Sequence, residues 1–221
     1  MNMWQRCRRL VGTCAIAWVS FSSAIAQSGP EVCGNPFINH YGPYDYRTAG
    51  PTVRKIVEEV HFTPGIETMT RPKNTMFHEM GQDVEYTLSV FPNHHRALIT
   101  MERLSIRWKQ DPAPGSKLPV ECWFDRAVRY RPDDTVARAL FAQFLGRRNR
   151  SADAVRHLEF ASDQAKENAL SQYNIGLVFL ELGQHERALR QAHRALSMGY
   201  TRTDLADSLK KIGKWADPAT N

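Results

Sequence analysis

Residues 169–202 read ALSQYNIGLVFLELGQHERALRQAHRALSMGYTR and carry the strongest structural signal in the chain. Laid over the sequence 34 residues earlier, their small and apolar positions coincide: Ile175 and Gly176 fall on Phe141 and Ala142, Phe179 on Leu145, Ala188 on Ala154, Ala192 on Leu158, and Ala195 on Ala161. Small side chains are needed where helices approach closely, because bulky ones hold them apart. The sequence therefore predicts two copies of one helical hairpin, at 135–168 and 169–202.

A third, degenerate copy is expected at about 93–134. Phe124, Ala127 and Pro132 occupy the repeat positions of its second helix, while a proline-rich loop at 111–117 displaces its first helix to 93–108. Residues 203–212 predict a final capping helix with Leu205 and Leu209 on its inner face. Three hairpins are about the minimum for a stable stack, so the repeats can form one body.

The period of 34 and the segments YNIGL at 173–177, LG at 182–183 and ERAL at 186–189 resemble the tetratricopeptide repeat (TPR) family. The resemblance is close over 135–202 and partial over 93–134. It implies a mainly all-α fold, a short solenoid of helical hairpins preceded by an irregular N-terminal arm. The chain is also similar to a group of exported bacterial TPR proteins without established activity, through YGPYDYR at 41–47, HFTP at 61–64 and FPNHHRAL at 91–98.

The N-terminus has the three parts of a secretory signal. Arg6, Arg8 and Arg9 precede an apolar run at 10–21, and AIA at 24–26 ends it. This pattern predicts a signal peptide at 1–26, cleaved after Ala26, and a periplasmic or secreted product. The run is shorter than the about 20 apolar residues that span a bilayer, so we expect no stable membrane insertion after cleavage.

Charge and cysteines narrow the function classes. The net charge of +6 includes the three signal arginines, which leaves about +3 for the mature chain and gives no reason to expect nucleic acid. Cleavage removes Cys7 and Cys14 and leaves Cys33 and Cys122. In an oxidising compartment these two are expected to form a disulfide, the alternative being two separate buried thiols.

Residues 27–82 are expected to form an arm with short elements, followed by a helical domain at 83–217. The Gly, Pro, Asn and Tyr content of 27–50 argues against regular structure and favours an extended arm lying on the helical body. Residues 52–62 fit either a short helix or a strand, and 63–69 fit a short helix with Thr63 as its N-cap. Helices are also expected at 83–91 and 93–108, separated at Pro92.

The TPR resemblance implies a concave groove, lined by the first helix of each hairpin, that binds an extended peptide or a helix. Carried over position by position, one repeat contributes Val136, Ala139, Leu140, Gln143 and Arg147, and the next contributes Leu170, Tyr173, Asn174, Leu177 and Glu181. The expected function is noncatalytic binding of an envelope protein or peptide, as an adaptor or scaffold. The alternative is that the chain's own arm fills the groove. The cations that some TPR proteins use to clamp a terminal carboxylate are absent from the matching positions.

A rival hypothesis places a small-ligand, metal or hydrolase site between the arm and the turn at 92–96. Its candidate residues are Asp45, Arg47, His61, His94, His95 and Arg96. Adjacent histidines on a helix point about 100° apart and do not chelate as a pair four residues apart would. The chain carries no G-x-S-x-G, H-E-x-x-H or phosphate-loop motif. We therefore expect neither catalysis nor a cofactor nor a metal.

Overall fold

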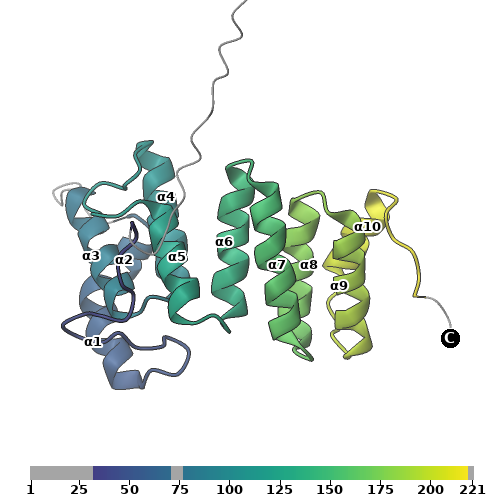
Figure 1. Cartoon of the computed structure of the whole chain (residues 1–221), viewed down its shortest axis with the longest axis horizontal. Coiled ribbons are helices and arrows are strands. Elements are labelled where there is room, and N and C mark those ends of the chain that lie inside the picture. Colours follow the sequence, from purple (N-terminus) through teal and green to yellow (C-terminus); the bar gives the residue numbers. More distant parts are fainter. Residues whose placement is uncertain (1–31, 71–76, 219–221) are drawn as a thin grey trace, which may run out of the picture.

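The computed structural model describes residues 32–70 and 77–218, and the regular structure of these residues is entirely α-helical. The signal peptide predicted at 1–26 lies outside them. The all-α fold class is confirmed. Ten helices follow one another along the described chain: α1 Pro51–His61, α2 Pro64–Glu67, α3 Phe77–Val90, α4 His95–Trp108, α5 Val120–Tyr130, α6 Thr135–Arg147, α7 Ser151–Ala165, α8 Ala169–Glu181, α9 His185–Ser197 and α10 Asp204–Lys211 (Figure 1).

Helices α6 to α9 form two antiparallel pairs that repeat with the predicted spacing. Helix α8 begins at residue 169 and α6 at 135, and α9 begins at 185 and α7 at 151, so each helix recurs 34 residues later. A Cβ built on Gly176 would lie 2.5 Å from Leu205 Cδ2 and 3.0 Å from Gln191 Cβ. Gly176 therefore stands where α8 meets both α9 and α10. Ala188, Leu205 and Leu209 are buried, as the repeat pattern predicts.

Three helices on one side of the molecule start with the same cap. His94, Asp134 and Asn168 precede α4, α6 and α8, and each side chain accepts a hydrogen bond from the backbone N–H three residues later, at 2.9–3.1 Å. Such a bond satisfies one of the free donors of a helix N-terminus. Asn and Asp are common caps, whereas a histidine cap commits one ring nitrogen to accepting.

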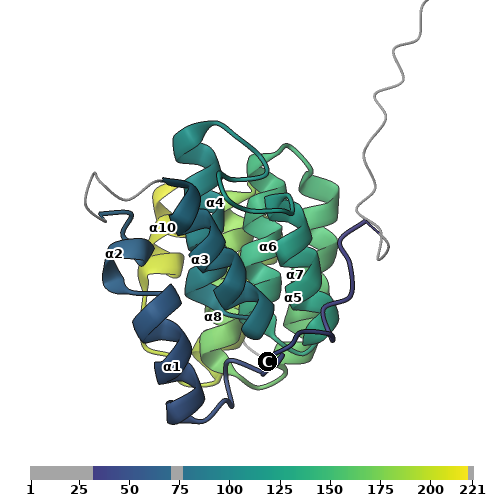
Figure 2. The same ribbon diagram turned by 90° about the vertical axis from the view of Figure 1, so that its left-hand side faces the viewer.

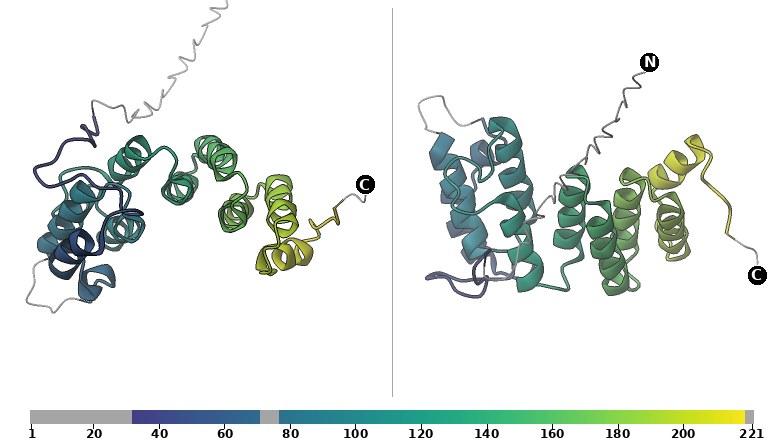
Figure 3. Two further views of the ribbon diagram at one scale, coloured as in Figure 1. Left: turned by 90° about the horizontal axis from the view of Figure 1, so that it is seen from below. Right: turned by 45° about the horizontal axis from the view of Figure 1, so that its top comes forward.

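The helices are arranged along an arc. Viewed from below, α6, α8 and α10 lie on its inner side, while α5, α7 and α9 lie on its outer side (Figure 3). The alternation follows from the short connections, since each helix folds back beside the one before it. The inner helices thus form one surface along the arc.

The N-terminal part departs from two expectations. Residues 51–61 are a helix, so the strand alternative for this stretch is wrong. Helix α3 begins at Phe77, which puts the expected boundary between residues 82 and 83 inside a helix. Gly81 lies inside this helix and does not interrupt it. The glycine is needed for packing, because a Cβ at this position would collide with the backbone carbonyl of Pro114.

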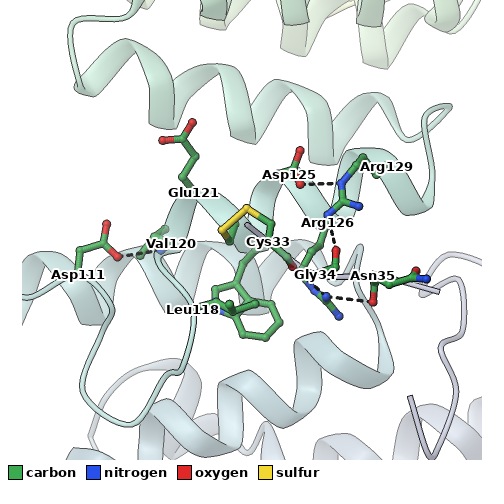
Figure 4. The surroundings of a disulfide bond; sticks show 12 residues. Cys33, Gly34, Asn35, Asp111, Leu118, Val120, Glu121, Asp125, Arg126 and Arg129 are labelled. Carbon is green, nitrogen blue, oxygen red and sulfur yellow. Dashed lines mark hydrogen bonds and ion pairs between the residues drawn. A yellow bond between two sulfur atoms is a disulfide. The ribbon is translucent and has the colours of Figure 1, made fainter. Parts of the chain in front are cut away.

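The arm is fastened to α5 by the predicted disulfide. Cys33 and Cys122 are bonded, with their Cα atoms 4.9 Å apart, and both are buried. Arg126 Nη1 donates to the carbonyls of Cys33 and Asn35 at 3.2 and 3.1 Å, and Arg129 Nη2 donates to that of Gly34 at 2.8 Å (Figure 4). The bond and the two arginines fix the start of the arm.

Candidate functional site

A cavity of about 230 Å³ lies between α6 and α8, on the inner side of the arc. Six of the predicted groove residues line it, with four neighbours. The lining consists of Thr135, Val136, Ala139, Leu140, Gln143, Ser171, Asn174, Ile175, Leu177 and Val178. Its surface is mainly aliphatic, with two side-chain amides and two hydroxyls. A concave apolar surface with a few polar groups is the usual form of a ligand site.

The two ends of this groove differ chemically. At the start of the two helices, the hydroxyls of Thr135 and Ser171 lie 3.3 Å apart. At their ends, Gln143 Nε2 donates to Glu181 Oε2 at 2.8 Å, and Arg147 Nη1 lies 3.7 Å from Glu181 Oε1. Since starts meet starts and ends meet ends, α6 and α8 run parallel, with a hydroxyl end and a charged end.

Arg147 is committed to an ion pair within the protein. Its Nε and Nη2 donate to the two carboxylate oxygens of Glu102 on α4, at 2.9 and 2.6 Å, and the Glu102 side chain is only 6% exposed. The paired geometry is that of a strong arginine–carboxylate contact. Arg147, predicted as a groove residue, thus neutralises a buried carboxylate and lies outside the cavity lining.

Asn174 has the opposite environment. Its side chain is half-buried in the cavity wall and makes no hydrogen bond to any of the described residues. An amide offers two donors and an acceptor, which match the polar groups of a peptide backbone. Val136 and Leu170 near it are 39% and 53% exposed, although both are large and apolar. Leu170 stands outside the cavity lining.

Tyr173 does not belong to the groove surface. It is 2% exposed, its ring packs on Tyr200 with centroids 4.7 Å apart, and its hydroxyl donates to Asp204 Oδ2 at 3.0 Å. Helix α10 and the segment before it cover the side of α8 on which Tyr173 lies. Tyr173, predicted as a groove residue, is instead buried, and its side chain connects α8 to α10.

The described part of the arm runs elsewhere. Tyr44 N donates to Val90 O at 2.8 Å, and Tyr130 Oη donates to Pro43 O at 3.0 Å, which places residues 43–44 against α3 and α5. Figure 2 shows this segment beside α5. Between residues 32 and 50, therefore, the arm does not fill the groove between α6 and α8.

The six residues of the rival pocket fall into separate groups. One group joins the arm to the turn before α6. Asn93 Nδ2 donates to Asp45 Oδ1 and Asp134 Oδ2, both at 2.8 Å, and His95 Nε2 lies 2.9 Å from both Asp134 oxygens. Arg47 donates to Asp45 at 3.0 and 2.7 Å. Burial raises the pKa of the Asp45 carboxyl, but hydrogen bonds from Arg47 and Asn93 outweigh it and hold that pKa below its usual range.

A second group gathers around Glu58. Its Oε1 accepts from Tyr46 Oη at 2.9 Å and Arg96 Nη2 at 3.1 Å, and lies 3.1 Å from His94 Nε2. His94 Nδ1 accepts from Ala97 N, so the neutral ring carries its proton on Nε2 and donates it to Glu58. Burial lowers the pKa of His94 to about 4, against the raising effect of Glu58.

The Glu58 group borders a cleft of about 700 Å³ between α1, α2 and the start of α4. Its lining carries equal numbers of bases and acids: Arg54, Lys55 and Arg96, and Glu58, Glu59 and Glu67. His61 stands apart again, with Nδ1 2.8 Å from Asp83 Oδ1 and its ring on Tyr86. The cleft receives only Arg96 from the predicted set, and the mixed charge favours no one ligand.

Sequence reasoning missed Glu58, Tyr46, Asn93 and Asp134 as members of these groups. Their partners lie 12 to 48 residues away in the chain, so no local motif marks them.

Within the described residues, no group of three or more His, Cys, Asp or Glu side chains is placed to hold a metal ion. Over the same residues, no helix combines the length and apolarity needed to cross a membrane. Comparison of the chain with models of known protein families and with curated proteins gives no match.

Proposed function

We propose that this protein is a noncatalytic, TPR-type binding module of the bacterial cell envelope, which holds a peptide segment of a partner protein in the groove between α6 and α8. It acts as an adaptor or scaffold after export and removal of residues 1–26. The disulfide between Cys33 and Cys122 supports an oxidising compartment, since such bonds persist there and are rare in the cytosol.

One observation carries the proposal: the apolar cavity and the unpartnered amide of Asn174 occur together. Exposed Val136 and half-buried Leu140 and Leu177 supply apolar contact, while Asn174 and Gln143 supply hydrogen-bonding groups in the same cavity wall. A buried amide without partners costs free energy, so a half-buried one in a concave wall is suited to a ligand that supplies the missing bonds. An extended peptide supplies both apolar side chains and backbone polar groups.

The separation of the rival residues also favours binding over hydrolysis. Nucleophile, base and orienting group must lie within hydrogen-bond reach of one another. Asp45 and His95 serve the arm network, His94 and Arg96 serve Glu58, and His61 pairs with Asp83. Each histidine is thus occupied with a different carboxylate.

The test compares matched variants in partner capture. Immobilised mature protein is incubated with an envelope extract, and the retained proteins are quantified against the unchanged protein. Asn174→Ala and Val136→Glu alter the groove, whereas Gln164→Ala and Leu196→Glu make the same types of change at exposed positions on α7 and α9. We expect each groove variant to lower capture of a specific protein by about tenfold, which corresponds to about 1.4 kcal/mol.

The control variants should retain capture, and all four proteins should melt within a few degrees of the unchanged protein. Equal loss in the groove and control variants would point to nonspecific adhesion. Unchanged capture by both groove variants would remove the groove from the function. Either outcome contradicts the proposal.

A further inference from the structure

We infer that the peptide bound between α6 and α8 carries a lysine or arginine beside its apolar residues, and that this basic side chain lies at the Glu181 end of the groove. The inference rests on the proposed function and adds the chemical class of the partner. It comes from the balance of charges at the ends of the two helices.

The negative charge of Glu181 is only partly compensated by the protein. Arg147 forms two hydrogen bonds to Glu102, at 2.9 and 2.6 Å, but lies 3.7 Å from Glu181. Two carboxylates therefore share one guanidinium, and the closer one takes most of it. The Glu181 side chain is 47% exposed, and it accepts a hydrogen bond from Gln143, which lines the cavity, so its charge is accessible at this end of the groove.

The other arginines of this turn do not compensate Glu181. Arg148 pairs with Asp111 at 3.1 Å, and Arg150 pairs with Glu121 at 2.6 Å. Glu121 belongs to α5, on the outer side of the arc (Figure 3). Both cations are thus bound to acids away from the groove, and the polar contact to Glu181 inside it is the neutral amide of Gln143.

The helix ends act in the same direction as Glu181. Helices α6 and α8 both end here, at Arg147 and Glu181, and the C-terminal end of a helix carries a partial negative charge. Their starts, beside Thr135 and Ser171, carry the opposite partial charge. A bound cation is therefore favoured at the Glu181 end and an anion is disfavoured there.

The length of the groove sets the size of the probe. Each of the two helices has 13 residues. At 1.5 Å per residue they are about 20 Å long, which matches about six residues of extended peptide. Capped octapeptides are therefore long enough to fill the groove. Two adjacent leucines supply the apolar contact, and two further residues beside the leucines test the charged end.

The experiment uses three sets of capped octapeptides, in which these two residues are both lysines, both glutamines or both glutamates. Each set contains one peptide with the pair before the leucines and one with the pair after them. Binding to the mature protein is followed through the NMR signals of the Asn174 and Gln143 side-chain amides. We expect the lysine peptides to bind about three- to fivefold more tightly than the glutamine peptides, the range of an exposed ion pair, and the glutamate peptides to bind most weakly. Added salt should reduce the difference.

The matched variants are Glu181→Gln and Glu186→Gln. Glu186 is exposed in the first turn of α9. Glu181→Gln should remove most of the preference for lysine and leave the small part due to the helix ends, and Glu186→Gln should preserve the full preference. Equal affinities of the three sets at the groove amides would overturn this inference and leave the proposed function standing. Failure of every set to shift those amides would overturn both.

Discussion

Each half of the helical body is stabilised by a different kind of contact. From Cys33 to Tyr130, long-range contacts dominate: a disulfide across 89 residues, carboxylates shared between the arm and α4, and the loop backbone of Pro114 pressed against Gly81. From Thr135 to Ser197, the same type of hairpin is held by apolar side chains and by small residues at helix contacts.

The difference teaches where binding can occur. Polar groups of the first half are largely consumed by each other, as Asp45, Asn93 and Asp134 illustrate. The repeat half leaves an apolar groove and the free amide of Asn174. The first half keeps a larger cleft, of about 700 Å³, but its lining is of mixed charge rather than mainly apolar.

The largest effect is expected from removing the disulfide. Replacing Cys33 and Cys122 by Ser should lower the free energy of unfolding by about 4 kcal/mol, because a loop of 89 residues is no longer closed in the unfolded chain. Hydrogen exchange should rise in the arm more than in α8 and α9. The protein without residues 1–26, which removes Cys7 and Cys14, should show no titratable thiol when it is denatured without reductant. Two titratable thiols would contradict the disulfide.

Acidification should act through His94. Because its pKa in the folded protein is about 4 and its unfolded value is 6.5, the unfolded state binds the proton first as the pH falls. Stability is therefore lost between about pH 6.5 and 4, by about 3 kcal/mol from this residue. His157 on α7, whose pKa burial also lowers to about 4, contributes in the same direction.

Ring titration by NMR separates the two histidines. The neighbouring Glu58 raises the pKa of His94, so Glu58→Gln should lower it further and leave His157 unaffected. A ring pKa for His94 near 6.5, or a response of His157 to the Glu58 change, would contradict the Glu58 group as described.

Substitutions at two glycines, Gly81 in the first half and Gly176 in the repeat half, compare how tightly helices are packed in the two halves. Gly81→Ala should cost about 1–3 kcal/mol, because its Cβ meets the backbone of Pro114, which cannot move aside easily. Gly176→Ala should cost less, because its closest contact is the mobile end of Leu205. Gly176→Leu should restore a large cost by overfilling the same space. Thermal unfolding checks all three, and the reverse order for the two alanine variants would show that the close contacts are misplaced.

The smallest effects on stability are expected for two neighbouring residues of α8, one buried and one in the cavity wall. Tyr173→Phe removes the hydroxyl bond to Asp204 and should cost about 1 kcal/mol of stability. Asn174→Ala should change stability by less than about 0.5 kcal/mol, because its amide bonds to none of the described residues. Denaturant titration distinguishes them, and a stability loss for Asn174→Ala as large as that for Tyr173→Phe would indicate a structural role for the amide.

Sequence periodicity predicted the repeat half well for a physical reason. Helix contacts repeat every 34 residues, so the same small and apolar positions can be recognised in both copies of the hairpin. Helices α6 to α9 lie within the expected hairpins. The disulfide was predictable because removal of the predicted signal peptide would leave only two cysteines, Cys33 and Cys122. Glu58 was not, since its partners come from the arm and from α4, and no short motif records a contact across 36 residues.

The candidate site was predicted in part. Ala139 and Tyr173 occupy the same repeat position and both are largely buried. Ala139 lines the cavity between α6 and α8, whereas the larger Tyr173 side chain packs on Tyr200 and donates to Asp204 of α10. Sequence reasoning did not find the ion pair of Arg147 with Glu102, because Glu102 lies in the degenerate repeat, where the alignment gives no equivalent position. Alignment locates a face of a helix, but what covers that face depends on the neighbours.

Site-specific photo-crosslinking in the native envelope tests the groove most directly. A benzophenone side chain is placed at Val136, in the cavity wall, or at Gln164, exposed on the outer helix α7. We predict a discrete adduct with one partner protein from position 136 that is absent from position 164 and weakened by Asn174→Ala. Adducts of equal yield from both positions, or from position 164 alone, would contradict the groove as the binding surface.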